Sequence, residues 1–142
     1  MSDFRVSNDS DFFEMAITIE ENSSLPNYAD AYITLEVQSG KFSGHNALWV
    51  QSESMASFCH ALVMLHQTLN GEALLESISP GKLQLKVFSC NSRGCLAIEG
   101  VIGSHLIGEN QKFWHSVSFG FEFEQTQLSA LLQLPWVKRY VT

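Results

Sequence analysis

The stretch KFWHSVSFGFEFEQTQL, residues 112–128, decides the fold of this 142-residue chain. In its first part every second residue has a ring or a branched apolar side chain: Phe113, His115, Val117, Phe119, Phe121 and Phe123. The residues between them are mostly small or polar. Because successive strand side chains point to opposite faces, this alternation predicts a strand over 112–123 with one face in a core. The apolar spacing then becomes helical, which predicts a C-terminal helix over 125–134 capped by Thr126.

The same alternation recurs along the chain and is interrupted once. It predicts strands at 13–19, 29–37, 42–50, 73–78, 83–88 and 95–102, with a bulge at Gly44 and a loop over 103–111. From Ser52 to Gly71 the apolar residues instead follow a helical stripe through Phe58 and Leu62. We therefore expect one long helix there, capped by Ser52 and packed across one face of the sheet.

These elements predict an α+β fold. It consists of an antiparallel meandering sheet of about seven strands, one long helix inserted after the third strand and a short C-terminal helix. The length fits a single domain over residues 1–142. Residues 1–11 are polar, and we expect them to form a flexible leader.

The charge of the chain is negative and unevenly distributed. It contains 15 acidic and 8 basic residues, and nine of the acids fall within residues 1–60, where the only bases are Arg5 and Lys41. Nucleic-acid affinity depends on clustered Lys and Arg, so this class of ligand is disfavoured. An acidic half attracts basic surfaces, which favours a basic protein partner.

The sequence also indicates a compartment. The first residues lack the apolar segment of a signal peptide, and no run of about 20 apolar residues is present, so neither secretion nor a membrane span is expected. An odd number of cysteines fits a reducing environment. We therefore expect a cytoplasmic protein.

No residue set predicts a catalytic, cofactor or metal site. His60 and His66 share a helix but point about 120° apart, which does not match the spacing of zinc ligands. Cys90 and Cys95 bracket a four-residue turn. In a reducing compartment, two free thiols are the favoured interpretation, and the alternative is a redox-sensitive disulfide or half of a metal site. The metal site would be incomplete, because no second cysteine pair is present to supply four thiolates.

Two surfaces have the composition of a contact region. The outer face of the long helix bears a single charge, Glu53, beside Ser57, His60, Met64 and Gln67. The non-core face of the sheet is expected to gather Tyr32, Phe88 and Trp114 beside small residues. Aromatic side chains next to small ones form a shallow platform of the kind found at protein interfaces.

Several motifs are similar to those of WapI-type immunity proteins of bacteria. They are Phe42-Ser43-Gly44, the helical set Phe58, Leu62, Leu65, Leu69 and Gly71, Leu83-x-Leu85-x-Val87, Gly94, and Phe119-x-Phe121-x-Phe123-Glu124-Gln125-Thr126-x-Leu128. The resemblance covers residues 12–134, whereas the sequence from Trp136 onward is unlike the family. It implies an antidote to a secreted toxin and assigns no contact residue.

The interpretation is therefore a non-enzymatic immunity protein, without a cofactor, that occludes a cationic toxin domain. The expected partner-binding residues are Asp30, Tyr32, Glu36, Glu53 and Trp114. The alternatives are a small-ligand-binding domain and a small enzyme with a pocket between helix and sheet, which would need polar groups such as His105 and His115 to converge near an acid. Self-association as a homodimer also stays open.

Overall fold

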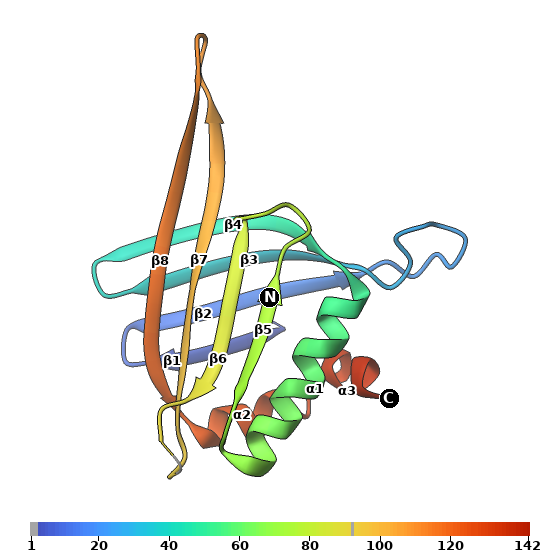
Figure 1. Ribbon diagram of the computed structural model, residues 1–142, viewed down its shortest axis with the longest axis vertical. Coiled ribbons are helices and arrows are strands. Elements are labelled where there is room, and N and C mark those ends of the chain that lie inside the picture. The colour runs from blue at the N-terminus through green and yellow to red at the C-terminus, as the bar shows by residue number, and fades with distance from the viewer. Residues whose placement is uncertain (1–2, 92) are drawn as a thin grey trace.

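The computed structural model describes residues 3–91 and 93–142, which form two four-stranded antiparallel sheets and three helices (Figure 1). The first sheet contains β1 (Phe4–Asn8), β2 (Asp11–Ile19), β3 (Ala31–Ser39) and β4 (Phe42–Val50), in that order. After α1 (Ser52–Thr68), the second sheet contains β5 (Glu72–Glu76), β6 (Leu83–Ser89), β7 (Cys95–Ile107) and β8 (Lys112–Glu124). The helices α2 (Gln125–Leu131) and α3 (Pro135–Val141) end the chain. The α+β class is confirmed, with eight described strands where about seven were predicted.

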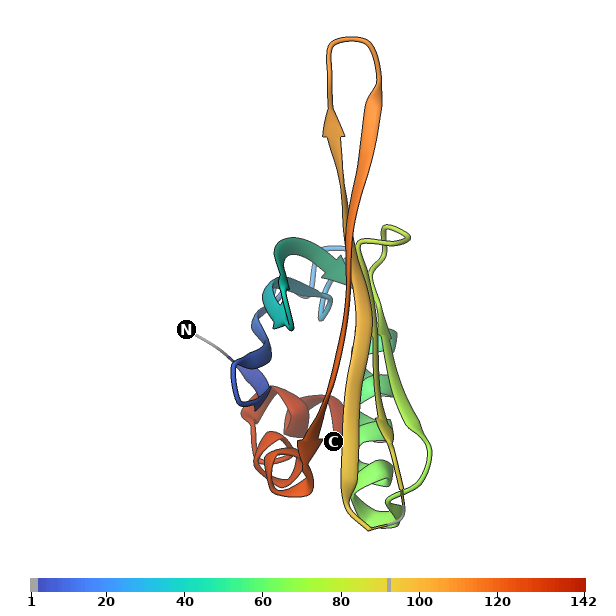
Figure 2. The same cartoon turned by 90° about the vertical axis from the view of Figure 1, so that its left-hand side faces the viewer.

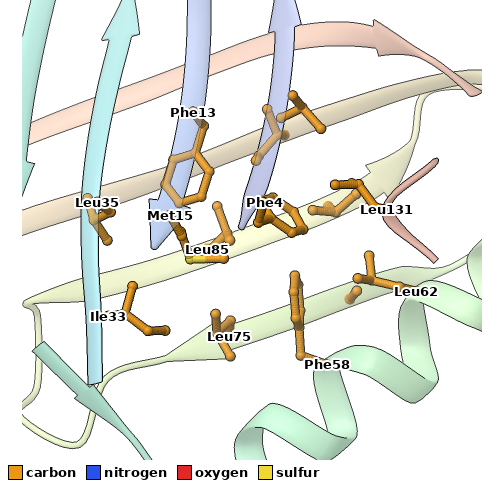
Figure 3. Packing of buried hydrophobic residues seen from close by; sticks show 14 of the residues in the cluster. Phe4, Phe13, Met15, Ile33, Leu35, Phe58, Leu62, Leu75, Leu85 and Leu131 are labelled. Atoms are coloured by element: carbon orange, nitrogen blue, oxygen red, sulfur yellow. The ribbon is translucent and has the colours of Figure 1, made fainter. Parts of the chain in front are cut away.

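The core lies between the two sheets, whose strands cross one another (Figure 1) and which form separate layers (Figure 2). Alternate residues of each strand point inward, so Phe4, Phe13 and Ile33 from the first sheet share one buried cluster with Leu75 and Leu85 from the second. Figure 3 shows side chains of α1 pointing into the same cluster. The meander breaks into two sheets at α1, which separates β4 from β5.

The α1 helix matches the predicted stripe. Its buried residues are Met55, Phe58, Cys59, Leu62 and Leu65. The ring centroids of Phe4 and Phe58 lie 6.1 Å apart, which ties the helix to the first sheet. The cap differs from the prediction, because Gln51 and not Ser52 is the N-cap residue. The helix ends at Leu69, which takes the left-handed conformation at φ 53° and donates its N–H to the Leu65 carbonyl.

The second sheet extends beyond the core as a two-stranded arm. The strand pairing of β6 with β7 ends at Ile102, so beyond the contacts of Gly103 at its base, residues 104–107 and 112–115 form a two-stranded hairpin. We call residues 103–116 the arm, and Figure 1 shows it projecting away from the three helices. The predicted loop over 103–111 is therefore wrong, since only residues 108–111 connect the strands. The alternation in β8 is confirmed near the core, where Phe119 and Phe123 are buried, whereas Phe113 and His115 are exposed on the arm.

Two further expectations need correction. A flexible leader was expected over residues 1–11, but residues 4–8 form strand β1, in which Phe4 and Val6 are buried. Residues 1 and 2 lie outside the described residues. The β3–β4 register is one-to-one throughout, so Gly44 forms no bulge. A Cβ on Gly44 would lie 2.9 Å from the Ile102 side chain, so a glycine here allows the sheets to approach. One residue of the predicted 91–94 turn, Ser92, also lies outside the described residues.

The C-terminal helices differ from the single helix predicted over 125–134. Glu124, not Thr126, is the N-cap residue of α2, which ends at Leu131. Pro135 then starts α3, because the first turn of a helix needs no N–H from that residue. Trp136 is buried and its indole N–H donates to the Asp3 carbonyl at 2.9 Å. The last helix thus holds the N-terminal strand against the core.

Candidate interaction surface

The outward face of the first sheet is built by strict alternation in β3. Its inward residues Ala31, Ile33, Leu35 and Val37 are buried. Tyr32, Thr34 and Glu36 point the other way and are exposed. Figure 2 shows this sheet as an outer layer of the molecule, with the second sheet on its other side. We call its outward side chains the acidic face.

The strand register arranges the acidic face into rows. One row runs Arg5, Glu14, Glu36 and His45, the next runs Ala16, Thr34 and Ala47, and the third runs Thr18, Tyr32 and Trp49. The small middle row leaves a shallow hollow of about 400 Å³. The acids Glu14 and Glu36 line this hollow, and the aromatic row lies beyond the middle row.

The acids on this face are only partly neutralised. Arg5 Nη1 lies 2.8 Å from Glu14 Oε2, in an exposed ion pair. Among the described residues, no ion pair involves Glu36, which stands directly across from Glu14. Like charges that face each other on paired strands repel, so a cation bound beside Glu14 and Glu36 would relieve this repulsion.

The aromatic row adds contact area. The rings of Tyr32 and Trp49 have centroids 5.3 Å apart, and both side chains are 38% exposed. Tyr and Trp are the residues that most often contribute binding energy at interfaces, and their ring faces attract cations. The acidic face thus offers both carboxylates and aromatic rings, in separate rows, to the basic side chains of a partner.

The uneven distribution of charge along the sequence corresponds to an uneven distribution between the two sheets. Residues 4–50 build the whole first sheet, so most of the acids counted within residues 1–60 belong to it or to its connections. Residues 61–142 contain six acids and six bases and build the second sheet, α2 and α3. One layer of the molecule is therefore acidic and the other is balanced.

The five residues expected to bind a partner do not form one site. Tyr32 and Glu36 lie on the acidic face, and Glu53 is exposed in the first turn of α1. Asp30 has a structural contact, because its Oδ1 accepts the N–H of Ser52 at 2.8 Å where α1 begins. Trp114 lies on the arm, in the other sheet.

The expected platform of Tyr32, Phe88 and Trp114 is not formed. Phe88 and Trp114 share the outward face of the second sheet, but the row of Phe88 ends at Glu122, eight residues along β8 from Trp114. At strand rise this is about 26 Å. Sequence reasoning missed Trp49 and Glu14, whose outward positions follow from the hairpin register of the strands.

The residues considered for the alternative functions are arranged as follows. His105 pairs with Trp114 and His115 with Ser104, so the two histidines point to opposite faces of the arm. Phe58 and Leu62, which would cover a ligand cavity between helix and sheet, are fully buried. Cys90 and Cys95 are free thiols.

Comparison with known proteins places the chain in a family. None of the helices formed by residues 3–91 and 93–142 has the length and apolar character needed to cross a membrane. No curated protein and no solved structure matches the chain. A family model does match, over residues 4–134, and it describes WapI-like immunity proteins. The resemblance seen in the motifs is thereby confirmed, and the chain belongs to the WapI-like immunity protein family.

Proposed function

We propose that this protein is a non-enzymatic immunity protein that acts in the cytoplasm, binds a cationic toxin domain and covers its active site. Membership of the WapI-like family supports the immunity role. The acidic face supports the choice of a basic partner, because it combines Glu36, which has no ion pair among the described residues, with the exposed Tyr32–Trp49 pair.

Binding would start with electrostatic steering. An acidic layer raises the rate of encounter with a basic surface, and complementary charge fixes the orientation of the two proteins. The ring pair then supplies apolar contact that slows dissociation. Neither step makes or breaks a covalent bond, so the toxin is inhibited by occlusion.

The acidic face alone is too small for a stable complex. Four strands span roughly 20 Å and nine residues span roughly 30 Å, which gives about 600 Å². A standard interface buries about 800 Å² on each partner. The contact therefore extends to neighbouring segments, and the connection before β3 offers the exposed Leu25 and Tyr28. Glu53 and Trp114 stay proposed contacts at its margin.

The test is a binding measurement with a candidate toxin domain encoded by a neighbouring gene. We expect Glu36→Lys to reduce the association rate at least about tenfold in low salt. Glu76→Lys is the matched control, since it reverses another exposed strand glutamate in the other sheet, and it should change the rate little. The absence of a complex at micromolar concentration, or equal effects of the two substitutions, would refute the proposal.

A further inference from the structure

Three side chains that can bind metal converge at one end of the second sheet, away from the acidic face. Cys90 and Cys95 flank the β6–β7 turn, and the Cys90 N–H donates to the Cys95 carbonyl at 2.9 Å. Glu122 belongs to β8 and pairs with Ala97, so it lies on the same sheet face as Cys95, one outward position farther along. Residues distant in sequence thus meet at this corner.

The distances suit a small tetrahedral cation. One ligand atom from each of Cys90, Cys95 and Glu122 lies within 4.8 Å of the other two. The Cys95 thiol donates to Glu122 Oε1 at 3.3 Å. Thiolate and carboxylate ligands of tetrahedral zinc stand about 3.6 to 3.8 Å apart. Small side-chain rotations therefore bring the three groups into a coordination geometry.

The chemistry of the cluster suits a cation. It offers two thiols and one carboxylate, which are ligand types that zinc accepts in proteins. Because the thiolate is the ligand, the binding of a divalent ion would release the thiol protons.

We propose that Cys90, Cys95 and Glu122 form a Zn²⁺ site with an open fourth position. Two thiolates select a soft or borderline ion such as zinc, and three protein ligands leave one position for water. Cys90 is exposed, so the ion has a path to the site. An adjoining polar hollow of about 480 Å³, lined in part by Asn8, Cys95 and Glu122, holds room for that water.

The bound ion would join the β6–β7 turn to β8. Cys90 directly follows the end of β6, Cys95 begins β7 and Glu122 belongs to β8, so the ion would link the β6–β7 turn to the next strand. A ligand that binds only the folded state stabilises it. The inference is independent of the proposed toxin binding, because it concerns another sheet and needs no partner.

The test uses the full-length protein, reduced and stripped of metal, and titrates it with Zn²⁺ alone. We expect one ion per chain, a rise in melting temperature, and thiolate-to-metal absorption when Co²⁺ replaces Zn²⁺. Cys90→Ser and Cys95→Ser should abolish all three signals. Glu122→Gln should weaken binding at least about tenfold, since it removes a charged ligand.

The matched control is Glu124→Gln. Glu124 is the next outward residue of β8, borders the same hollow and lies outside the three-residue cluster. The Glu124→Gln variant should bind zinc with an affinity within about twofold of that of the unmodified protein, whereas the Glu122→Gln variant should not. Equal affinity in the Glu122→Gln variant and the unmodified protein would overturn the proposal. So would a reduced protein that binds no zinc and only forms a Cys90–Cys95 disulfide when treated with an oxidant.

Discussion

The indole ring of Trp114 lies against the backbone of Gly103, so closely that a Cβ on Gly103 would stand 2.1 Å from Trp114 Cζ2. The same Cβ would lie 2.7 Å from the carbonyl oxygen of Gly81. Gly103 also donates its N–H to the Lys82 carbonyl at 3.2 Å. The base of the arm is therefore fixed to the β5–β6 connection by the packing of the Trp114 ring against glycine backbone and by a backbone hydrogen bond.

Gly103→Ala should destabilise the protein by about 1 to 3 kcal/mol, the usual cost of forcing an extra methyl into a packed site. Urea denaturation measures the change. In a Trp114→Ala background the same substitution should cost less, because the nearest obstacle is gone. Identical costs in the two backgrounds would contradict the stacking contact.

Asn46 links the two sheets through its amide group. Its Nδ2 donates to the carbonyl oxygens of Gly103 at 2.8 Å and Lys82 at 3.1 Å. Asn46→Asp keeps the shape but places a carboxylate against two acceptors, so we expect a loss of about 2 kcal/mol or more. The loss should shrink as the pH falls and the carboxyl group gains a proton, which thermal melts at several pH values would reveal. A pH-independent loss would refute this explanation.

Alkaline pH should destabilise the protein through one buried group, Cys59, and one partly buried group, Tyr140. Burial raises the pKa of the Cys59 thiol from 9.0 to about 12 and is the main cause that raises the pKa of Tyr140 from 10.0 to about 12. Both pKa values are higher in the folded state, so stability is complete below pH 9.0 and is lost as the pH rises toward about 12.

Each group contributes a slope of at most about 1.4 kcal/mol per pH unit. Tyr140→Phe should therefore flatten the dependence above pH 10.0, although it removes the 2.6 Å hydrogen bond from the Tyr140 hydroxyl to the Ala29 carbonyl. Urea midpoints measured across the alkaline range test this. An unchanged slope in this variant would show that another group is responsible.

Trp136 should be essential for stability although its helix lies beyond the matched region, residues 4–134. Its ring centroid is 6.1 Å from that of Phe4 and its indole N–H bonds to Asp3. Trp136→Ala should cost about 3 to 5 kcal/mol. Trp49→Ala, at a half-exposed tryptophan, serves as the control and should cost about 1 kcal/mol or less.

Much of the fold was predictable because period-two and helical patterns are local. The strands at 13–19 and 42–50 and the stripe through Phe58 and Leu62 appear as expected. The division into two sheets was not predictable, since the packing of one sheet on the other involves contacts far apart along the chain, such as that of Gly44 with Ile102. Strand β1 was missed because only Phe4 and Val6 mark it among polar neighbours.

The candidate surfaces depended still more on pairing. The alternation placed Tyr32 and Glu36 on an outward face, but not beside Trp49 and Glu14, because that requires the register between strands. The approach of Glu122 to the cysteines likewise needs the β7–β8 pairing. The sequence also gave no sign that Asp30 binds the start of α1.

The arm has no core of its own, and this gives it a freedom that the rest of the chain lacks. Adding two residues to each of its strands would lengthen its reach by about 7 Å and leave every ring on its original side. Adding one residue to each would turn Trp114 and its neighbours to the other side. The hairpin can thus be lengthened beyond Trp114 in even steps without disturbing a buried contact between the sheets.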